Sequence, residues 1–245
     1  MNYKSYKLTS KELFKIVIQY LAITSVVAYL FYDSVIVFFI LVPGFLFYLK
    51  NKRMALIEKR KDELKLQFKD TIDAVATALS SGMSIENAFR EACMDMEKLY
   101  GERSYIVLEL KDILQKINVN FTLSAALNDF AKRCDIEDIK DFATIFSEAK
   151  ISGGNLKEII SRTVIVIKEK AEVETDIKVM INGKNFEQKI MSFIPFIIIL
   201  YLRISSGGFV NVLYHNTAGV LVMSVCLFIY VISSIMAARI IDIKV

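Results

Sequence analysis

The stretch TAGVLVMSVCLFIYVISSIMAA, from Thr217 to Ala238, decides the class of fold. It runs for about 22 residues without a charged side chain, and about 20 apolar residues in a helix are enough to cross the hydrocarbon core of a bilayer. The whole chain shares this bias, since 54% of its residues are hydrophobic and its mean hydropathy is +0.43. That composition is too apolar for an ordinary soluble domain, so we expect a protein that lies partly in lipid.

A second apolar run, Ile190 to Ile204, precedes this stretch and pairs with it as a membrane hairpin over residues 190–238. Pro195 lies inside the run, where a membrane helix tolerates proline because neighbouring helices bind the freed backbone groups. Arg203 follows near its end, and two interpretations of this residue stay open: it pairs with Asp33, or its side chain extends to a lipid phosphate.

Another hairpin is expected over residues 13–49. Leu13 to Phe31 is long enough to cross the hydrocarbon, a polar turn follows, and Val35 to Leu49 is apolar again. Lysines and arginines gather outside both hairpins and not in their turns. The positive-inside rule therefore places residues 1–12, the central residues 50–189 and the tail 239–245 in the cytoplasm.

The central residues carry most of the charge and contain no proline. Apolar side chains recur there at steps of three and four, as at Phe68, Ile72, Val75 and Leu79, which is the period of an amphipathic helix. We predict an all-α fold with four transmembrane helices and a cytoplasmic six-helix antiparallel bundle, because short connections favour antiparallel neighbours. The six helices are expected near residues 56–80, 85–99, 102–117, 123–133, 136–150 and 156–182.

Small polar residues mark where these helices should begin, because their side chains accept hydrogen bonds from unpaired amides of the first turn. The expected N-caps are Ser84, Thr122, Asp135 with Asp138, and Asn155 with Glu158.

A turn pattern recurs at intervals of about 33 to 38 residues, and it predicts a helix stop followed at once by a helix start. The three copies begin at Gly82, Asn120 and Gly153, where glycine or asparagine suits the left-handed conformation that ends a helix. Turns between helices often carry similar residues by chance or in any helical repeat, and this explains part of the recurrence. The expected structural turn residues are Gly82, Gly153, Gly154 and Pro195.

Two of these turns carry a resemblance to a known family. LSSGMSIENAF, residues 79–89, and SGGNLKEII, residues 152–160, are similar to the signature turns of the type II secretion system F domain. The resemblance covers about residues 64 to 240. Within that family the chain resembles the TadB and TadC branch, which serves Flp (tight adherence) pili, since the last span pair and the basic tail look similar.

The resemblance implies a non-enzymatic platform protein of the cytoplasmic (inner) membrane. Its implied partners are a hexameric secretion ATPase, pilin or prepilin subunits, and a paralogous platform subunit or a second copy of the chain. Many relatives carry a glutamate where this chain has Ile151, so we expect no acidic or metal-binding role at that position.

A basic segment follows the first hairpin and is the candidate contact surface. Two interpretations stay open: it sets topology and attracts anionic lipid, which we favour, or it docks the ATPase. Its residues are Lys50, Lys52, Arg53, Lys59, Arg60 and Lys61.

Other classes of function find little support in the sequence. We find no phosphate-binding GxxxxGK[ST] loop, no paired-histidine motif and no GxSxG turn, so we expect no catalytic residue, cofactor or metal. His215 and the isolated cysteines suggest no metal site, and the modest net charge of +4 suggests no nucleic-acid partner. A small transporter or channel is the alternative, although Gln19 is nearly the sole polar group inside the spans.

Overall fold

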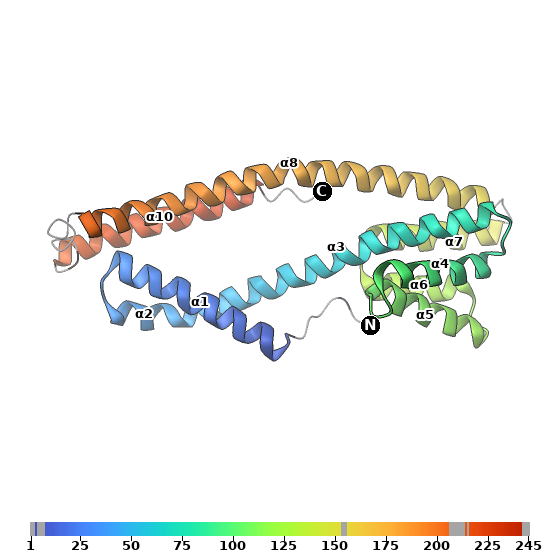
Figure 1. Ribbon diagram of the computed structural model, residues 1–245, viewed down its shortest axis with the longest axis horizontal. Coiled ribbons are helices and arrows are strands. Elements are labelled where there is room, and N and C mark those ends of the chain that lie inside the picture. The colour runs from blue at the N-terminus through green and yellow to red at the C-terminus, as the bar shows by residue number, and fades with distance from the viewer. Residues whose placement is uncertain (1–2, 4–7, 153–155, 206–213, 215, 242–245) are drawn as a thin grey trace. The chain divides into compact units, whose positions relative to one another are not determined.

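The computed structural model describes residues 3, 8–152, 156–205, 214 and 216–241, and the elements among them are helices with no strand (Figure 1). The all-α prediction is therefore confirmed for these residues. In chain order they are α1 (Ser10–Phe31), α2 (Val35–Leu41), the 3-10 turn η1 (Val42–Gly44), α3 (Phe45–Ser80), α4 (Ile85–Tyr100), α5 (Tyr105–Asn118), α6 (Leu123–Cys134), α7 (Glu137–Ser152), α8 (Leu156–Ser205) and α10 (Thr217–Ile241).

The chain divides into two compact units. Unit 1 contains Met1–Lys7 and Lys52–Glu172, and unit 2 contains Leu8–Asn51 and Val173–Val245. Helices α3 and α8 each contribute residues to both units.

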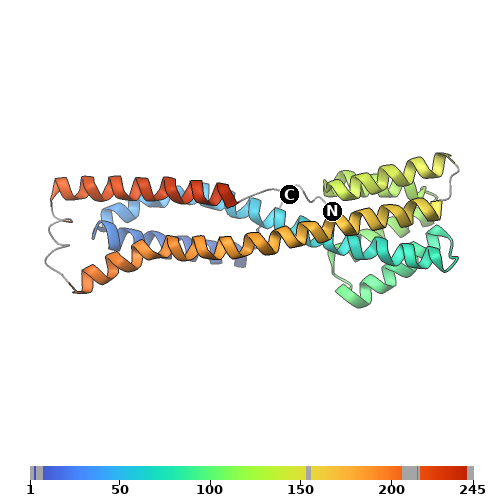
Figure 2. The ribbon, with the colours of Figure 1, turned by 90° about the horizontal axis from the view of Figure 1, so that it is seen from above.

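Unit 1 contains helices α4 to α7 with parts of α3 and α8, and each of α4 to α7 packs beside the next, as Figure 1 and Figure 2 show. Phenylalanine rings make the centre of the core: Phe68 of α3 lies with its ring centroid 6.2 Å from that of Phe130 and 5.5 Å from that of Phe142. All three side chains are buried. The amphipathic period read from the sequence thus gives the buried face of these helices.

Two of the predicted turns repeat one another in detail. Gly82 and Asn120 both have left-handed backbone, with φ of 89° and 67°. The next amide then donates to a carbonyl five residues back, from Met83 to Ala78 at 3.2 Å and from Phe121 to Lys116 at 3.0 Å. This is the Schellman arrangement that satisfies the last carbonyls of a helix. The third copy, with Gly153, Gly154 and Asn155, lies outside the described residues.

The predicted N-caps are confirmed at two positions and wrong at one. The Ser84 hydroxyl accepts from the amide of Asn87 at 3.4 Å, and that of Thr122 accepts from Ala125 at 3.2 Å. Asp135 instead ends α6, with a left-handed φ of 57°, and α7 begins at Glu137. Aspartate takes the left-handed conformation more easily than most residues. Asp135, which we expected to begin the next helix, therefore ends α6.

Two helices extend beyond the bounds expected for them. Helix α8 passes through Gly183 and Pro195 and continues to Ser205, so the helix expected over 156–182 and the apolar run from Ile190 form one element. Glycine inside a helix costs about 1 kcal/mol, which weakens a helix without ending it. The second apolar run breaks at Pro43 into η1, and α3 starts at Phe45, well before the basic segment.

Unit 2 contains the apolar helices. Across the described residues, four helical stretches are long and apolar enough to cross a membrane: Ser10–Phe31, Val35–Ser80, Lys157–Ser205 and Thr217–Ala237. Large apolar side chains such as Phe39, Leu46 and Phe228 are exposed on them, as lipid contact requires.

Candidate functional site

Arg203 of α8 lies against the end of α1 and resolves the choice that the sequence left open. Its guanidinium pairs with the Asp33 carboxylate and donates to the carbonyl of Tyr29, and it lies 3.8 Å from the centroid of the Tyr29 ring. The Tyr214 hydroxyl donates to the neighbouring carbonyl, that of Leu30. These contacts satisfy carbonyls of the last turn of α1, which have no partner within the helix.

Tyrosines also bind backbone beside the two prolines of unit 2. The Tyr20 hydroxyl donates to the Leu41 carbonyl at 2.6 Å, next to η1 with Pro43. The Tyr230 hydroxyl of α10 donates to the Ser192 carbonyl at 2.9 Å, three residues before Pro195. In both places a tyrosine of a neighbouring helix donates to a carbonyl within three residues of a proline. Pro195 itself lies within α8 and does not end it.

The basic segment lies on α3, and the structure divides its cations into two groups. Lys50, Arg53 and Lys59 are exposed, whereas Lys52, Arg60 and Lys61 are half-buried. The Lys61 ammonium donates to the Asp135 carbonyl at 3.2 Å and lies 3.6 Å from its carboxylate.

Arg60 is likewise used inside unit 1, where its guanidinium lies 4.5 Å from the centroid of the Tyr3 ring and 4.8 Å from that of Tyr105. Cation–π contacts of this kind are strongest where water is excluded. Arg60 and Lys61 therefore make contacts within unit 1, whereas Lys50, Arg53 and Lys59 are exposed.

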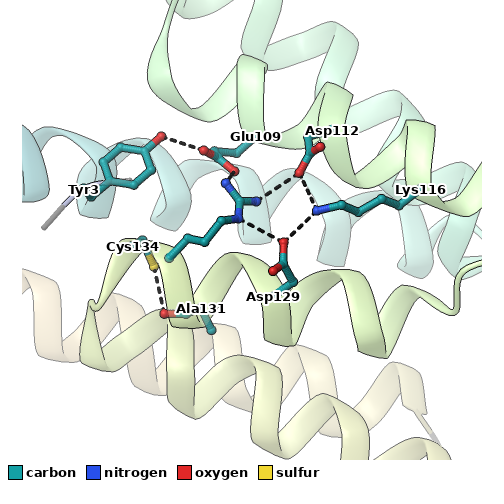
Figure 3. A network of polar contacts seen from close by, with 8 residues as sticks. Tyr3, Glu109, Asp112, Lys116, Asp129, Ala131 and Cys134 are labelled. Carbon is teal, nitrogen blue, oxygen red and sulfur yellow. Dashed lines mark hydrogen bonds and ion pairs between the residues drawn. The ribbon is translucent and has the colours of Figure 1, made fainter. Parts of the chain in front are cut away.

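A polar network joins α5 to α6 (Figure 3). The Arg133 guanidinium contacts three carboxylates: Glu109 at 2.6 Å, Asp112 at 3.0 Å and Asp129 at 2.9 Å. The Lys116 ammonium bridges the last two at 2.7 and 2.6 Å. Hydrogen bonds from Lys116, together with the charge of Arg133, lower the pKa of Asp129 although burial alone would raise it. Three carboxylates thus share two cations, and Glu109 is 2% exposed.

Asp138 is a second buried carboxylate and joins three helices. Its side chain is 4% exposed, and the ammonium groups of Lys65 on α3 and Lys170 on α8 lie 3.0 and 2.6 Å from it. Burial works to raise the pKa of Asp138, but the hydrogen bonds from the two lysines outweigh it and the pKa is lowered. A second pair, Lys168 with Asp73 at 2.5 Å, also ties α8 to α3.

The ion pairs of Glu109, Arg133 and Asp138 were not predicted from the sequence, although a signal was present. Glu109 comes three residues after Ile106 and four before Ile113, so it falls on the buried face of α5. Asp138 precedes the buried Phe142 by four residues. A charge on an apolar face predicts a buried ion pair, because an unpaired charge there is too costly.

These polar groups hold helices together, and their arrangement does not suggest catalysis. Within the described ranges no group of three histidine, cysteine or acidic side chains is placed to hold a metal ion. Burial raises the pKa of the Cys93 and Cys134 thiols, which makes them less nucleophilic. The conjecture about His215 falls outside the described residues.

Comparison with known proteins matches the chain to a family. Residues 71–202 match the family model described as type II secretion system (T2SS), protein F. The matched part takes in α4 to α7 with parts of α3 and α8. No curated protein and no solved structure matches the chain.

Proposed function

Because the chain belongs to the type II secretion system protein F family, whose model covers more than half of it, we propose that it is the inner-membrane platform of a type IV-like (Flp, tight adherence) pilus or of a type II secretion assembly machine. Family members are membrane platform proteins of type II secretion and type IV pilus-like systems, and they are not enzymes. The match of residues 71–202 to the family is the observation that carries the platform role, and the resemblance of the last span pair and the basic tail favours the Flp branch.

The platform has no catalytic step of its own and couples a cytoplasmic hexameric secretion ATPase to the extraction of pilin from the bilayer. Its further partner is a paralogous platform subunit or a second copy of the chain. The ion pairs that tie α3, α7 and α8 at Asp138 support this role, because transmitting force requires helices that move together.

The proposed topology is multi-pass in the cytoplasmic membrane. Residues 13–49 and 190–238 form two hairpins, and residues 1–12, 50–189 and 239–245 lie in the cytoplasm. The four apolar helical stretches support the spans, and the placement of lysine and arginine outside the hairpins supports the orientation.

The exposed cations Lys50, Arg53 and Lys59 directly follow the second apolar run, so the proposed ligand of this group is anionic lipid. Each contributes on the order of 1 kcal/mol when it lies near a negatively charged surface. Docking of the ATPase is the competing role. Arg60 and Lys61 are left out of the group because they bind within unit 1.

The proposal is tested by affinity purification of the tagged full-length protein from detergent extract, with mass spectrometry of the proteins that accompany it. We expect a secretion ATPase or a prepilin. A triple variant, Lys50→Glu, Arg53→Glu and Lys59→Glu, should keep the ATPase if these cations bind lipid and lose it if they dock the motor. The matched control reverses three exposed cations of unit 1 that lie outside the basic segment: Arg103→Glu, Lys132→Glu and Lys150→Glu. Repeated recovery of neither partner with folded protein would contradict the platform role.

A further inference from the structure

Tyr3 is buried in unit 1, far along the chain from the helices that surround it. Its side chain is 0% exposed, and its hydroxyl donates to the Glu109 carboxylate at 2.9 Å, as Figure 3 shows. Its amide donates to the Arg133 carbonyl at 3.4 Å. A residue near the chain start is therefore held by both its backbone and its side chain.

The slot around Tyr3 is formed by three helices of the bundle. Arg60 of α3 lies over one face of the ring, and Tyr105 of α5 meets it edge to face, with centroids 6.2 Å apart. Glu109 of α5 accepts from the hydroxyl, and Arg133 of α6 holds the other oxygen of that carboxylate at 2.6 Å.

The groups that line the slot are positioned by contacts within the bundle. Arg133 is held by Asp112 and Asp129 as well as by Glu109, and Arg60 also lies over the ring of Tyr105. The slot therefore holds an aromatic ring, with the Arg60 guanidinium over one face of the ring and the Glu109 carboxylate as acceptor for the hydroxyl. These features suit a tyrosine side chain. Phenylalanine would fill the space and leave the acceptor without this donor.

We propose that this slot is a binding site for the N-terminal segment of the same chain, with Tyr3 as its anchoring side chain. Six residues separate Tyr3 from the start of α1 at Ser10, and an occupied slot holds Tyr3 itself against the bundle. The segment acts as a ligand within the chain, and Tyr3 sets its specificity. The inference does not depend on the partners of the platform.

The test separates the segment from its slot. The full-length Tyr3→Ala variant, whose own segment lacks the anchoring side chain, is purified in detergent, and a labelled peptide of residues 1–9, MNYKSYKLT, is titrated into it while fluorescence anisotropy is recorded. We expect saturable binding. The Tyr3→Phe peptide should bind at least about tenfold more weakly, because a hydrogen bond to a charged group is lost, and the Tyr3→Ala peptide should not bind measurably. Changes in the peptide leave the receiving protein intact, so a lost signal does not arise from misfolding.

A second measurement keeps the chain whole. Tyr3→Phe in the full-length protein should raise amide hydrogen exchange in α5 near Glu109 and in α6 near Arg133, whereas Phe121→Ala, which removes an exposed aromatic side chain, should not. Equal binding of the wild-type and Tyr3→Ala peptides would overturn the proposal. So would unchanged exchange in the full-length Tyr3→Phe variant.

Discussion

At the scale of single residues, the buried carboxylates hold unit 1 together. Asp138 is charged although its side chain is almost fully buried, and it stays so because Lys65 and Lys170 lie within 3.0 Å of it. Removing one member of such a group leaves the other charges uncompensated, which costs more than the group contributes when complete.

Asp138→Asn should destabilise the packing of α7 against α3 and α8. We expect a loss of about 2 kcal/mol, below the roughly 3–5 kcal/mol typical of a fully buried pair, because Lys170 is partly exposed. Hydrogen–deuterium exchange of the α7 amides measures this loss. Glu158→Gln, which breaks the exposed pair with Arg162, is the control. It should change the free energy of opening that amide exchange measures by less than about 0.5 kcal/mol. Equal effects of the two variants would contradict the structural role of Asp138.

Tyr100 links stability to alkaline pH. Burial and the hydrogen bond to Asp70 raise the pKa of its phenol from 10.0 to about 12. The folded state therefore holds this proton more tightly than the unfolded state, and the stabilisation is complete below pH 10 and is lost as pH rises towards 12. The near-ultraviolet absorbance of tyrosinate should show a late-titrating group that disappears in Tyr100→Phe. A titration unchanged by that substitution would contradict the assignment.

Sequence alone identifies some of these residues and not others. Ser84 and Thr122 were predictable because their role depends on the next three residues of the chain. Asp135 was not, since the same short polar side chain suits either end of a helix. The partner of Glu109 could not be deduced, because Arg133 and Tyr3 come from distant parts of the chain.

At the scale of elements, the helices of unit 1 begin in two different ways. Ser84 and Thr122 cap α4 and α6 with their own hydroxyls. At the start of α5 the Ser104 hydroxyl makes no such bond, and the amide of Ile106 donates to the buried Gln67 of α3 at 3.1 Å. A neighbouring helix thus caps α5.

Ser84→Ala and Thr122→Ala should each cost about 1 kcal/mol, because an amide of the first turn loses its acceptor. The same change at Ser104 should be close to neutral. Amide exchange in the first turns of α4, α5 and α6 distinguishes these outcomes. A loss at Ser104 as large as that at Thr122 would show that Gln67 does not cap α5.

Tyr230→Phe should weaken the pairing of α10 with α8, since the hydroxyl donates to the Ser192 carbonyl near Pro195. Interhelical hydrogen bonds of this kind contribute about 0.6 kcal/mol on average and rarely more than about 1.7 kcal/mol. Reversible unfolding in mixed micelles should show a loss in that range. Tyr201→Phe, which changes an exposed ring on α8, is the control and should leave the midpoint unchanged.

Helices α4 to α7 could be predicted because apolar side chains recur at helical spacing and small polar residues mark the helix ends. Both are local properties of the sequence. The extent of α3 and α8 did not follow. Helix α8 continues through the change from charged to apolar composition near Gly183, so composition alone does not show where a helix ends.

At the scale of the whole molecule, the proposed topology makes opposite predictions for two positions. Asn216→Cys, just before α10, should react with a membrane-impermeant maleimide added outside the cell, and Lys150→Cys in α7 should react only after permeabilisation. Cys226 is exposed and is first replaced by serine, whereas Cys93 and Cys134 are buried. Labelling of residue 150 from outside would contradict a cytoplasmic bundle.

The most direct test of the platform role is nucleotide hydrolysis by the full-length protein in lipid nanodiscs, measured alone and with the hexameric secretion ATPase. The account predicts no hydrolysis by the protein alone and a changed hydrolysis rate of the ATPase in its presence. Hydrolysis by the protein alone, or an ATPase rate that does not respond to it, would contradict the account.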